Sequence, residues 1–531
     1  MSGRRVLIVG GGHNGLVAAA YLARGGASVT LLERRELLGG ACVTEECWPG
    51  YRVSRAAYVL SLFRPRIARE LELARHGLVL LPRRPSSFTP TPDGRSLVLG
   101  VDPALNAAEI GRFSKRDAEA FPRYEALLAR IGDALEPTLD VLPPDPAIRG
   151  PADLVPWWRL MRAAMRLGRD APAATRLLLG PARELLEEWF DSEPLRGTLA
   201  TDAVIGAFAA PSTPGTGYVL FHHVMGSMTG HRGVWAYVQG GMGALSEALA
   251  RAARAAGAEL RCAAPVSQLR TRHGRVSGVV LEGGEEIEAD AVASCADPAR
   301  TFGLLEDGDA LPETFRRALA AIDYRSPVVK LNLALRGLPR FRATDRPAGE
   351  PTPLSGTIHL GAQDLDAIDA AFDDARAGRV SQRPVVELTL PSVVDATLAP
   401  EGCHVASVFA QYAPALAMDD AAWPGLRDQV RDRVLACCEE AAPGFTDRVE
   451  HIEVLAPPDL EATFGLTGGN IFHGAMTPDR LLFMRPVAGW ARHRTPVPGL
   501  WLCGSGAHPG GGVMGAPGRN AALAMLRDLR R

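Results

Sequence analysis

The hydrophobic and polar positions at the start of the chain predict a strand, a helix and a second strand in close succession. Residues 6–9 form a short apolar run of the kind found in buried parallel strands. Residues 16–24 place apolar side chains on one face of a helix, and the glycine pair at 25–26 ends that pattern. Residues 29–32 read as a second buried strand, with Glu33 at its tip. This order is typical of the βαβ unit of a Rossmann-type domain.

The same kind of pattern returns in two segments far along the chain. In residues 236–300 we expect a helix (242–256), a strand (260–269), a β-hairpin turning at Gly283-Gly284 and another strand (290–294). In residues 491–531 we expect a strand (500–503), a glycine-rich loop and a closing helix from about residue 516. Residues 1–79 and these two segments are therefore predicted to form one discontinuous domain.

Residues 80–235 and 301–490 are predicted to form a second, inserted domain that holds the substrate. The first part reads as mostly helical, and the second contains strand-like runs at 328–335, 385–390 and 404–412. At 531 residues the chain is too long for one ordinary core, which supports the division. The predicted fold class is mixed α/β, with a discontinuous Rossmann-type domain and an inserted substrate domain.

A glycine motif, Gly10-x-Gly12-x-x-Gly15, lies at the first predicted strand-to-helix turn. In that order, the glycines permit a tight turn, let the backbone approach a pyrophosphate, and let helix and strand pack closely. The helix N-terminus adds free N–H groups and a positive dipole end for the phosphates. Glu33 follows Gly15 by 18 residues, near the spacing of an acid that binds ribose hydroxyls and disfavours NADP. Together these residues predict a dinucleotide site.

The glycine pair Gly39-Gly40 favours FAD over NAD at this site, because the motif and the acid fit both. In the large flavoprotein class that resembles glutathione reductase and the amine oxidases, a glycine pair at this place packs against the cofactor. An ordinary nicotinamide dehydrogenase has no reason for the pair. We therefore favour FAD and keep a soluble NAD dehydrogenase as the alternative.

The composition restricts the partners of the protein. The net charge of -2 gives no support to nucleic-acid binding. Neither a CxxC pair nor a metal-binding motif occurs, so no metal ion is expected. No run approaches the ~20 apolar residues of a membrane span, and no secretion signal precedes the glycine motif. We therefore expect a cytoplasmic protein.

Residues 157–169 form a basic amphipathic pattern at helical spacing. One face carries the arginines Arg159, Arg162, Arg166 and Arg169, and another carries Trp158, Met161 and Met165. A helix of this kind can lie in a membrane interface. It can equally cover a pocket entrance or pack on its own domain. Peripheral membrane contact through this stretch is therefore one of three hypotheses.

Seven stretches spread over nearly the whole chain carry a family resemblance. They are GGGHNGLVAAAYLARGG, GGACVTEE, PGYRVSRAAYVLSL, GVWAYVQGGMGALSEALA, TLAPEGCHVASVFAQY, GGNIFHGAMTPDRLLFMRP and LWLCGSGAHPGGGVMGAPGRNAA. The chain resembles the phytoene-desaturase-related flavoproteins, and within them the branch called pyridine nucleotide-disulfide oxidoreductase domain-containing protein 2. The resemblance implies FAD, discontinuous FAD and substrate domains of the glutathione-reductase/amine-oxidase class, and oxidoreductase activity. It does not transfer a substrate.

The resemblance also implies further cofactor contacts. Val266 stands where this class lets the backbone meet the adenine side, and Gly504 and Ser505 stand near the ribityl chain. Many members carry an acid there, so the Ser505 hydroxyl would take its role. The glycine-rich approach to the last helix predicts flavin contact by Met514 and the backbone near Gly515, because a helix N-terminus stabilises negative charge.

The stretch HRGVWAYVQGGMG supplies the candidates for the substrate pocket: His231, Arg232, Trp235 and Tyr237. In this class, that approach lies near the isoalloxazine ring. The alternative is that the two aromatic residues are core at a domain interface and that Arg232 is a structural ion-pair partner. Four other histidines, His222, His223, His473 and His508, have no metal-like spacing and are predicted to be core or loop residues. Because a flavin supplies the chemistry itself, no catalytic residue is assigned.

The leading hypothesis is an FAD-dependent dehydrogenase or desaturase. A hydride would pass from an apolar or extended substrate to flavin N5, and O2, a quinone or another acceptor would reoxidise the flavin. Two alternatives stay open: a redox-neutral isomerase that uses reduced flavin, and a flavin-stabilised interaction protein without turnover. No motif specifies the substrate, the electron acceptor or the oligomeric state.

Overall fold

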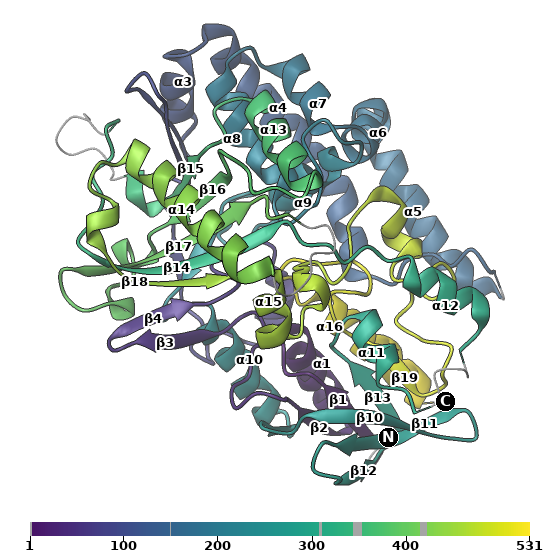
Figure 1. Ribbon diagram of the computed structural model, residues 1–531. Coiled ribbons are helices and arrows are strands. Elements are labelled where there is room, and N and C mark those ends of the chain that lie inside the picture. Colours follow the sequence, from purple (N-terminus) through teal and green to yellow (C-terminus); the bar gives the residue numbers. More distant parts are fainter. Residues whose placement is uncertain (1–2, 149, 307–310, 344–352, 415–421, 531) are drawn as a thin grey trace.

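A five-stranded parallel sheet built from three distant segments forms one end of the molecule (Figure 1). The computed structural model describes residues 3–148, 150–306, 311–343, 353–414 and 422–530. The strand order is β19-β13-β1-β2-β9. The strands are β1 (Arg5–Val9), β2 (Ser28–Leu32), β9 (Glu259–Arg261), β13 (Ala291–Ser294) and β19 (Leu500–Leu502). The predicted discontinuous Rossmann-type sheet is confirmed.

Three helices from the same three segments share a core with this sheet. They are α1 (His13–Arg24), α10 (Gly243–Ala255) and α16 (Ala516–Leu529). The apolar spacing predicts all three, and α1 contacts both of the others. Gly518 lets α16 pack closely against α1, because a Cβ at this position would lie 2.1 Å from the carbonyl oxygen of Asn14. The first and last helices of the chain are thus joined at their N-terminal ends.

The expected single strand over 260–269 is wrong. The chain instead forms β9 and then β10 (Val266–Arg272), which belong to different sheets. Between them Ala263 has a φ of 50°, which breaks extended geometry, and Pro265 lacks the N–H needed to continue a ladder. β10 pairs instead with β11 (Arg275–Leu281), which pairs with β12 (Glu286–Glu288), so the hairpin at Gly283-Gly284 is confirmed.

A seven-stranded sheet fills the middle of the other part of the molecule, in the order β18-β14-β17-β16-β15-β6-β7. Its strands are β6 (Ser87–Pro90), β7 (Ser96–Leu99), β14 (Val328–Arg336), β15 (Thr357–Leu360), β16 (Val385–Thr389), β17 (Cys403–Gln411) and β18 (Val449–Leu455). The sequence predicts strands at β14, β16 and β17, and all three form. β14 is buried at every position except its last, which explains its nearly continuous apolar pattern.

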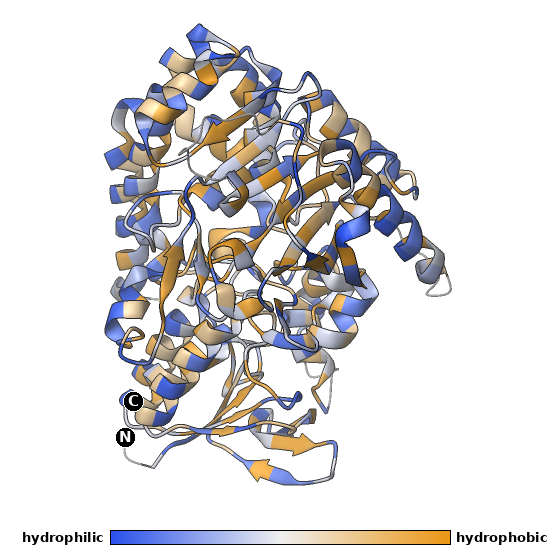
Figure 2. Cartoon of the chain, turned by 90° about the vertical axis from the view of Figure 1, so that its left-hand side faces the viewer, coloured by the Kyte–Doolittle hydropathy of each residue, from blue (hydrophilic) through white to orange (hydrophobic). Residues whose placement is uncertain are grey.

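Helices pack around that sheet, and Figure 2 shows the contrast between apolar strands inside and mixed helices at the edge. Seven of these helices lie in sequence between residues 80 and 235: α3 (Pro103–Gly111), α4 (Lys115–Leu135), α5 (Leu154–Leu167), α6 (Ala171–Leu179), α7 (Ala182–Trp189), α8 (Glu193–Val204) and α9 (Thr216–Val224). Further helices are α2 (Pro65–Glu70), α11 (Pro298–Gly303), α12 (Glu313–Ala320), α13 (Leu365–Arg376), α14 (Trp423–Ala441) and α15 (Pro457–Phe464). Short strands complete the fold: β3 (Thr44–Trp48), β4 (Tyr51–Ser54), β5 (Leu80–Pro82) and β8 (Ala236–Val238). Within the described ranges, none of the helices is both long and apolar enough to cross a bilayer.

Candidate functional site: a dinucleotide groove and an adjoining apolar cavity

A groove of about 480 Å³ opens at the carboxyl ends of the parallel strands β1 and β2, where α1 begins. Ligands of open α/β sheets bind at this edge. Six of the predicted cofactor-binding residues line the groove: Gly10, Gly12, Glu33, Gly40, Val266 and Ser505. They come from all three segments of the discontinuous domain, so the fold gathers them into one site.

Two of the three glycines in the motif have a steric reason. Gly10 adopts a φ of 98°, a backbone conformation that residues other than glycine rarely adopt. A Cβ on Gly15 would lie 2.2 Å from the carbonyl oxygen of Gly10, so α1 can pack this close to β1 only without a side chain there. Gly12 is the residue that precedes α1, and its side is open to the groove.

Glu33 is anchored by the backbone of the glycine loop. Its Oε2 accepts a hydrogen bond from the N–H of Gly11 at 2.7 Å, and its Oε1 accepts one from the N–H of Arg35 at 2.9 Å. The side chain is buried and yet lines the groove. The carboxylate is therefore held at the position where the spacing predicts an acid for the ribose.

Gly39 and Gly40 press against the same loop. Gly39 forms a β-bridge with Gly12, and a Cβ on Gly39 would lie 2.4 Å from the carbonyl oxygen of Cys42. A Cβ on Gly40 would lie 3.2 Å from the Cα of Gly12. Gly40 lines the groove and Gly39 lies behind it. The pair therefore shapes one wall of the groove and leaves bare backbone there.

The polar atoms of the groove fit a dinucleotide. Five buried side-chain atoms of its lining have no hydrogen-bond partner in the described part of the chain: His13 Nε2, Asn14 Oδ1, Arg35 Nη1, Arg300 Nε and His473 Nδ1. Buried polar atoms are ordinarily paired, so this cluster calls for a polar ligand. Two of the atoms belong to guanidinium groups, which suit phosphate oxygens.

The four predicted flavin contacts of the C-terminal loop lie in different surroundings. Ser505 accepts a hydrogen bond from Asn14 Nδ2 at 3.1 Å, and a Cβ on Gly504 would lie 2.2 Å from the carbonyl oxygen of Cys295. Gly515 has a φ of 73° and precedes α16. The side chain of Met514 lies in the core among α4, α6, α8 and α9, outside the walls of the groove and of the second cavity. The wall of the second cavity contains Gly512 and Val513 instead.

A second cavity of about 170 Å³ adjoins the groove on the side of the seven-stranded sheet. Five residues line both spaces: His13, Ala41, Leu466, His473 and Ser505. The remaining wall is mainly apolar and includes Val59, Leu62, Ile205, Phe409, Leu460 and Ile471. The two spaces therefore adjoin, and the groove is the more polar of the two.

Comparison with known proteins agrees with this geometry. Residues 8–71 match the NAD(P)-binding Rossmann-like domain, and residues 149–369 match the flavin containing amine oxidoreductase family. The chain is 48% identical to pyridine nucleotide-disulfide oxidoreductase domain-containing protein 2 of Rattus norvegicus, covering 99% of this chain and 93% of the rat protein. It is 31% identical to hydroxyneurosporene desaturase of Cereibacter sphaeroides, covering 99% and 98% of the two chains.

The chain belongs to the phytoene-desaturase-related flavoproteins.

The protein is therefore an FAD-dependent oxidoreductase, as the sequence predicts. The fold agrees: a putrescine oxidase variant superposes with a TM-score of 0.63 at 18% identity, covering 99% of each chain. Cyclohexylamine oxidase from Brevibacterium oxydans gives a TM-score of 0.58 at 20% identity, covering 99% of this chain and 100% of the other. In this flavoprotein, the residues of the groove would hold the dinucleotide of FAD.

Of the four residues predicted to line the substrate pocket, only Trp235 lines the apolar cavity. The ring of His223 lies 5.8 Å from the ring of Trp235. Tyr237 is buried behind that wall, 5.6 Å from the guanidinium of Arg83. His231 is exposed. Arg232 forms ion pairs with Glu136 and Asp133 at 2.7 Å each, as the structural alternative expects.

Lys330 is a cavity residue that no sequence motif indicated. It is fully buried on β14, and its Nζ donates hydrogen bonds to Asn332 Oδ1 and Ser407 Oγ at 2.6 Å each. Burial lowers the pKa of Lys330 to about 7. A signal was present in the composition, since the sequence has only two lysines and the other, Lys115, is exposed on α4.

Tyr58 links the cavity to a buried carboxyl group. Its ring lies 5.4 Å from Nζ of Lys330, and its hydroxyl donates to Glu387 Oε2 at 2.9 Å. Burial raises the pKa of Glu387 to about 7. Thr201 also hydrogen-bonds this carboxyl group, and its hydroxyl lies 3.2 Å from Nδ1 of His359. A chain of polar groups thus leads from the apolar cavity to Glu387 on β16 and His359 on β15.

The histidines near the cavity are neutral. Burial lowers the pKa of His13 and of His222 to about 3, and that of His223 to about 4. His223 Nδ1 bonds the carbonyl oxygen of Val219 at 2.8 Å, as expected for a core histidine. It nevertheless lines the cavity, as does His473. The prediction of core or loop histidines thus misses that these two also face the site.

Proposed function

We propose that this flavoprotein dehydrogenates an apolar, extended substrate that enters the cavity beside Trp235. FAD supplies the chemistry, since its N5 atom accepts a hydride removed from carbon, and O2 or a quinone would take the electrons afterwards. Two relatives support an apolar substrate: hydroxyneurosporene desaturase, and a limonene dehydrogenase chain of Castellaniella defragrans at 26% identity.

One observation carries the proposal: the apolar cavity adjoins the dinucleotide groove, with five residues common to both. A substrate in the cavity would therefore lie against the end of the cofactor that carries the ring system. The aliphatic and aromatic wall excludes water and offers few polar partners, which suits a hydrocarbon better than a sugar or a nucleotide.

Two polar residues of the cavity can handle the proton that leaves with each hydride. Lys330 can accept a proton at Nζ near neutral pH, because burial holds its pKa at about 7. Tyr58 orients its hydroxyl toward Glu387 and so connects the cavity with a group that also titrates near pH 7. These residues position and move a proton, while Trp235 and His223 shape the wall.

The test is anaerobic reduction of the bound flavin by a panel of terpenoid hydrocarbons, terpenoid alcohols and aliphatic amines. Lasting loss of the visible flavin absorbance with a hydrocarbon or terpenoid alcohol supports the proposal. Product formation that requires pre-reduced flavin and leaves its spectrum unchanged would identify an isomerase instead. If aliphatic amines alone bleach the flavin, or if no compound changes the spectrum, the proposal is wrong.

A further inference from the structure

Helix α5 carries an apolar face that the described structure leaves at least half exposed. Four of its side chains are at least half exposed: Leu154 at 51%, Trp158 at 51%, Met161 at 53% and Met165 at 62%. Of the nine large hydrophobic residues that stand out as exposed among the described residues, five belong to this one helix. Scattered exposed apolar residues are ordinary, but a concentration of this kind marks an interaction surface.

The four exposed residues share one face because they follow each other at intervals of four, three and four. The opposite face holds Pro156, Leu160, Ala163 and Leu167, of which Ala163 is buried and the others are half-buried. The helix is thus apolar on two sides. The inner side attaches the helix to the protein, and the outer side is left about half exposed to solvent.

A basic flank accompanies the outer apolar face. Arg159, Arg162 and Arg166 follow one another along the helix, and none forms an ion pair with a described acidic residue. The guanidinium of Arg162 lies 5.4 Å from the ring of Trp158 instead. On neighbouring α4, by contrast, Arg130 pairs with Asp170 at 2.7 Å. Unpaired arginines beside an apolar face match a surface that is both apolar and anionic.

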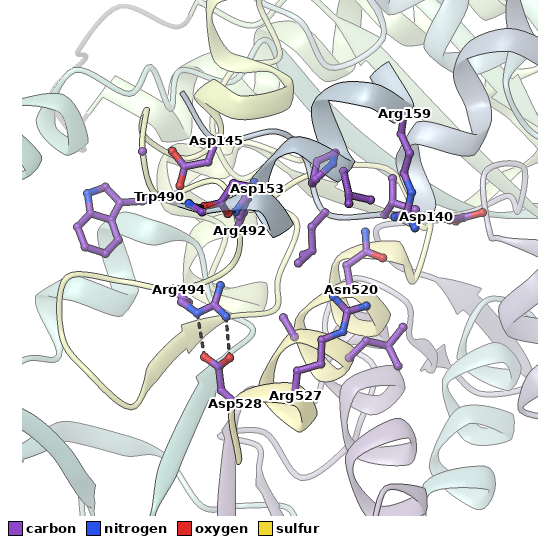
Figure 3. Close-up of a pocket in the computed structure, with 18 residues that line it drawn as sticks. Asp140, Asp145, Asp153, Arg159, Trp490, Arg492, Arg494, Asn520, Arg527 and Asp528 are labelled. Atoms are coloured by element: carbon purple, nitrogen blue, oxygen red, sulfur yellow. Dashed lines mark hydrogen bonds and ion pairs between the residues drawn. The ribbon is translucent and has the colours of Figure 1, made fainter. Parts of the chain in front are cut away.

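Two clefts separate α5 from its neighbours, and Figure 3 shows the larger one, of about 640 Å³, between α5 and α16. The second, of about 510 Å³, lies toward α4, and Arg159 lines both. In the larger cleft Asp528 is held by Arg494 at 2.7 Å, so this acid does not neutralise Arg159 or Arg527. Asp140 and Asp153, which also line this cleft, pair with Arg64 and Arg492 in the same way, so these three acids leave the arginines of α5 without a partner.

We propose that α5 docks this protein onto an anionic phospholipid bilayer. The outer apolar face would enter the boundary between headgroups and acyl chains, and the arginines would contact the phosphate groups, as amphipathic helices with Trp and Arg do. The inference does not depend on the proposed function. The two agree, however, because an apolar substrate would be dissolved in such a bilayer.

Vesicle flotation of the FAD-loaded full chain tests this, with phosphatidylcholine vesicles that contain or lack phosphatidylglycerol. We expect flotation that requires phosphatidylglycerol. The double variant R162Q/R166Q should weaken binding roughly 30-fold, since each basic residue near an anionic surface contributes about 1 kcal/mol. The triple variant W158S/M161S/M165S should abolish flotation. Two matched controls are Arg123→Gln, at an exposed position of α4, and Val101→Ser, at an exposed apolar position away from α5. Both variants should float as the unchanged protein does.

Three outcomes would overturn the inference. The first is absence of flotation with either vesicle. The second is flotation that the α5 variants leave unchanged. The third is self-association of the unchanged protein that the triple variant abolishes while flotation is absent, which would assign the face to a second copy of the chain. Because α5 lies at the surface, the visible flavin spectrum and the melting temperature serve as checks that the variants fold.

Discussion

The dinucleotide groove and the apolar cavity meet, yet they are built in opposite ways. The groove is made by backbone: the glycines at 10, 15 and 40 leave no room or no suitable backbone conformation for a side chain, so that loop and helix can approach one another. The cavity is made by side chains from segments as distant as Tyr58, Ile205, Lys330 and Phe409. A backbone-built site tolerates almost no added atom, whereas a side-chain-built site can change its contents without disturbing the fold. The cofactor should therefore be fixed in this architecture, and the substrate should be adjustable.

The largest expected effect tests the groove. Gly15→Ala should give protein that loses most of its FAD, because the new Cβ would lie 2.2 Å from the carbonyl oxygen of Gly10. Gly283→Ala is the matched control, since a Cβ there meets nothing within 4 Å. The measurement is the ratio of flavin absorbance to protein absorbance after purification. A yellow Gly15→Ala protein with full FAD content would show that the turn is not constrained as described.

The next effect belongs to the cavity. Lys330→Met should retain FAD and lower kcat by about 100-fold, the usual scale for a group that transfers a proton. The unchanged enzyme should gain kcat/KM as the pH rises through about 7, where Lys330 becomes able to accept a proton, and the variant should lack that rise. Lys115→Met, which removes the exposed second lysine, should behave as the unchanged enzyme. Equal pH profiles for all three would exclude Lys330 from the chemistry.

A smaller effect concerns stability and the carboxyl group behind Tyr58. In the folded protein burial raises the pKa of Glu387 from 4.5 to about 7, so the fold favours the protonated acid. Its contribution to stability is therefore fully present below pH 4.5 and is lost as the pH rises through about 7. Glu387→Gln should show a flatter dependence of unfolding free energy on pH across that window. Denaturant titrations at several pH values measure this, and parallel curves for the two proteins would contradict it.

The smallest effect should come from Arg232, which pairs with Glu136 and Asp133 away from the cavity. Arg232→Gln should lower stability by about 1 kcal/mol, because Glu136 is mostly buried, and should leave kcat/KM unchanged. Thermal unfolding and steady-state kinetics on the same preparation decide this. A fall in kcat/KM with an unchanged melting temperature would instead show that Arg232 takes part in substrate binding.

The difference between the two regions also explains what could be predicted from the sequence. Gly10, Gly12, Gly15 and Glu33 lie within one βαβ unit, so local spacing is enough to identify the groove. Lys330 has no such context, because its partners Asn332 and Ser407 are set by the pairing of β14 with β17.

The sequence likewise does not predict which way single side chains in the loops around the site point. Trp235 and Arg232 are three residues apart, yet one faces the cavity and the other an ion-pair cluster on α4. Met514 points into the core although the preceding Val513 lines the cavity. Which way a loop side chain points depends on tertiary packing, and no periodic pattern encodes it.

The central claim is that the apolar cavity beside the groove holds the substrate, and filling it tests that claim most directly. Ala56 lines the cavity, and Ala377 is exposed at the C-terminal end of α13. Using the best reductant from the panel, we would measure the rate of anaerobic flavin reduction in Ala56→Trp and in Ala377→Trp. The account predicts that Ala56→Trp retains FAD and is no longer reduced, while Ala377→Trp is reduced at the normal rate. Normal reduction of Ala56→Trp would show that the substrate binds elsewhere.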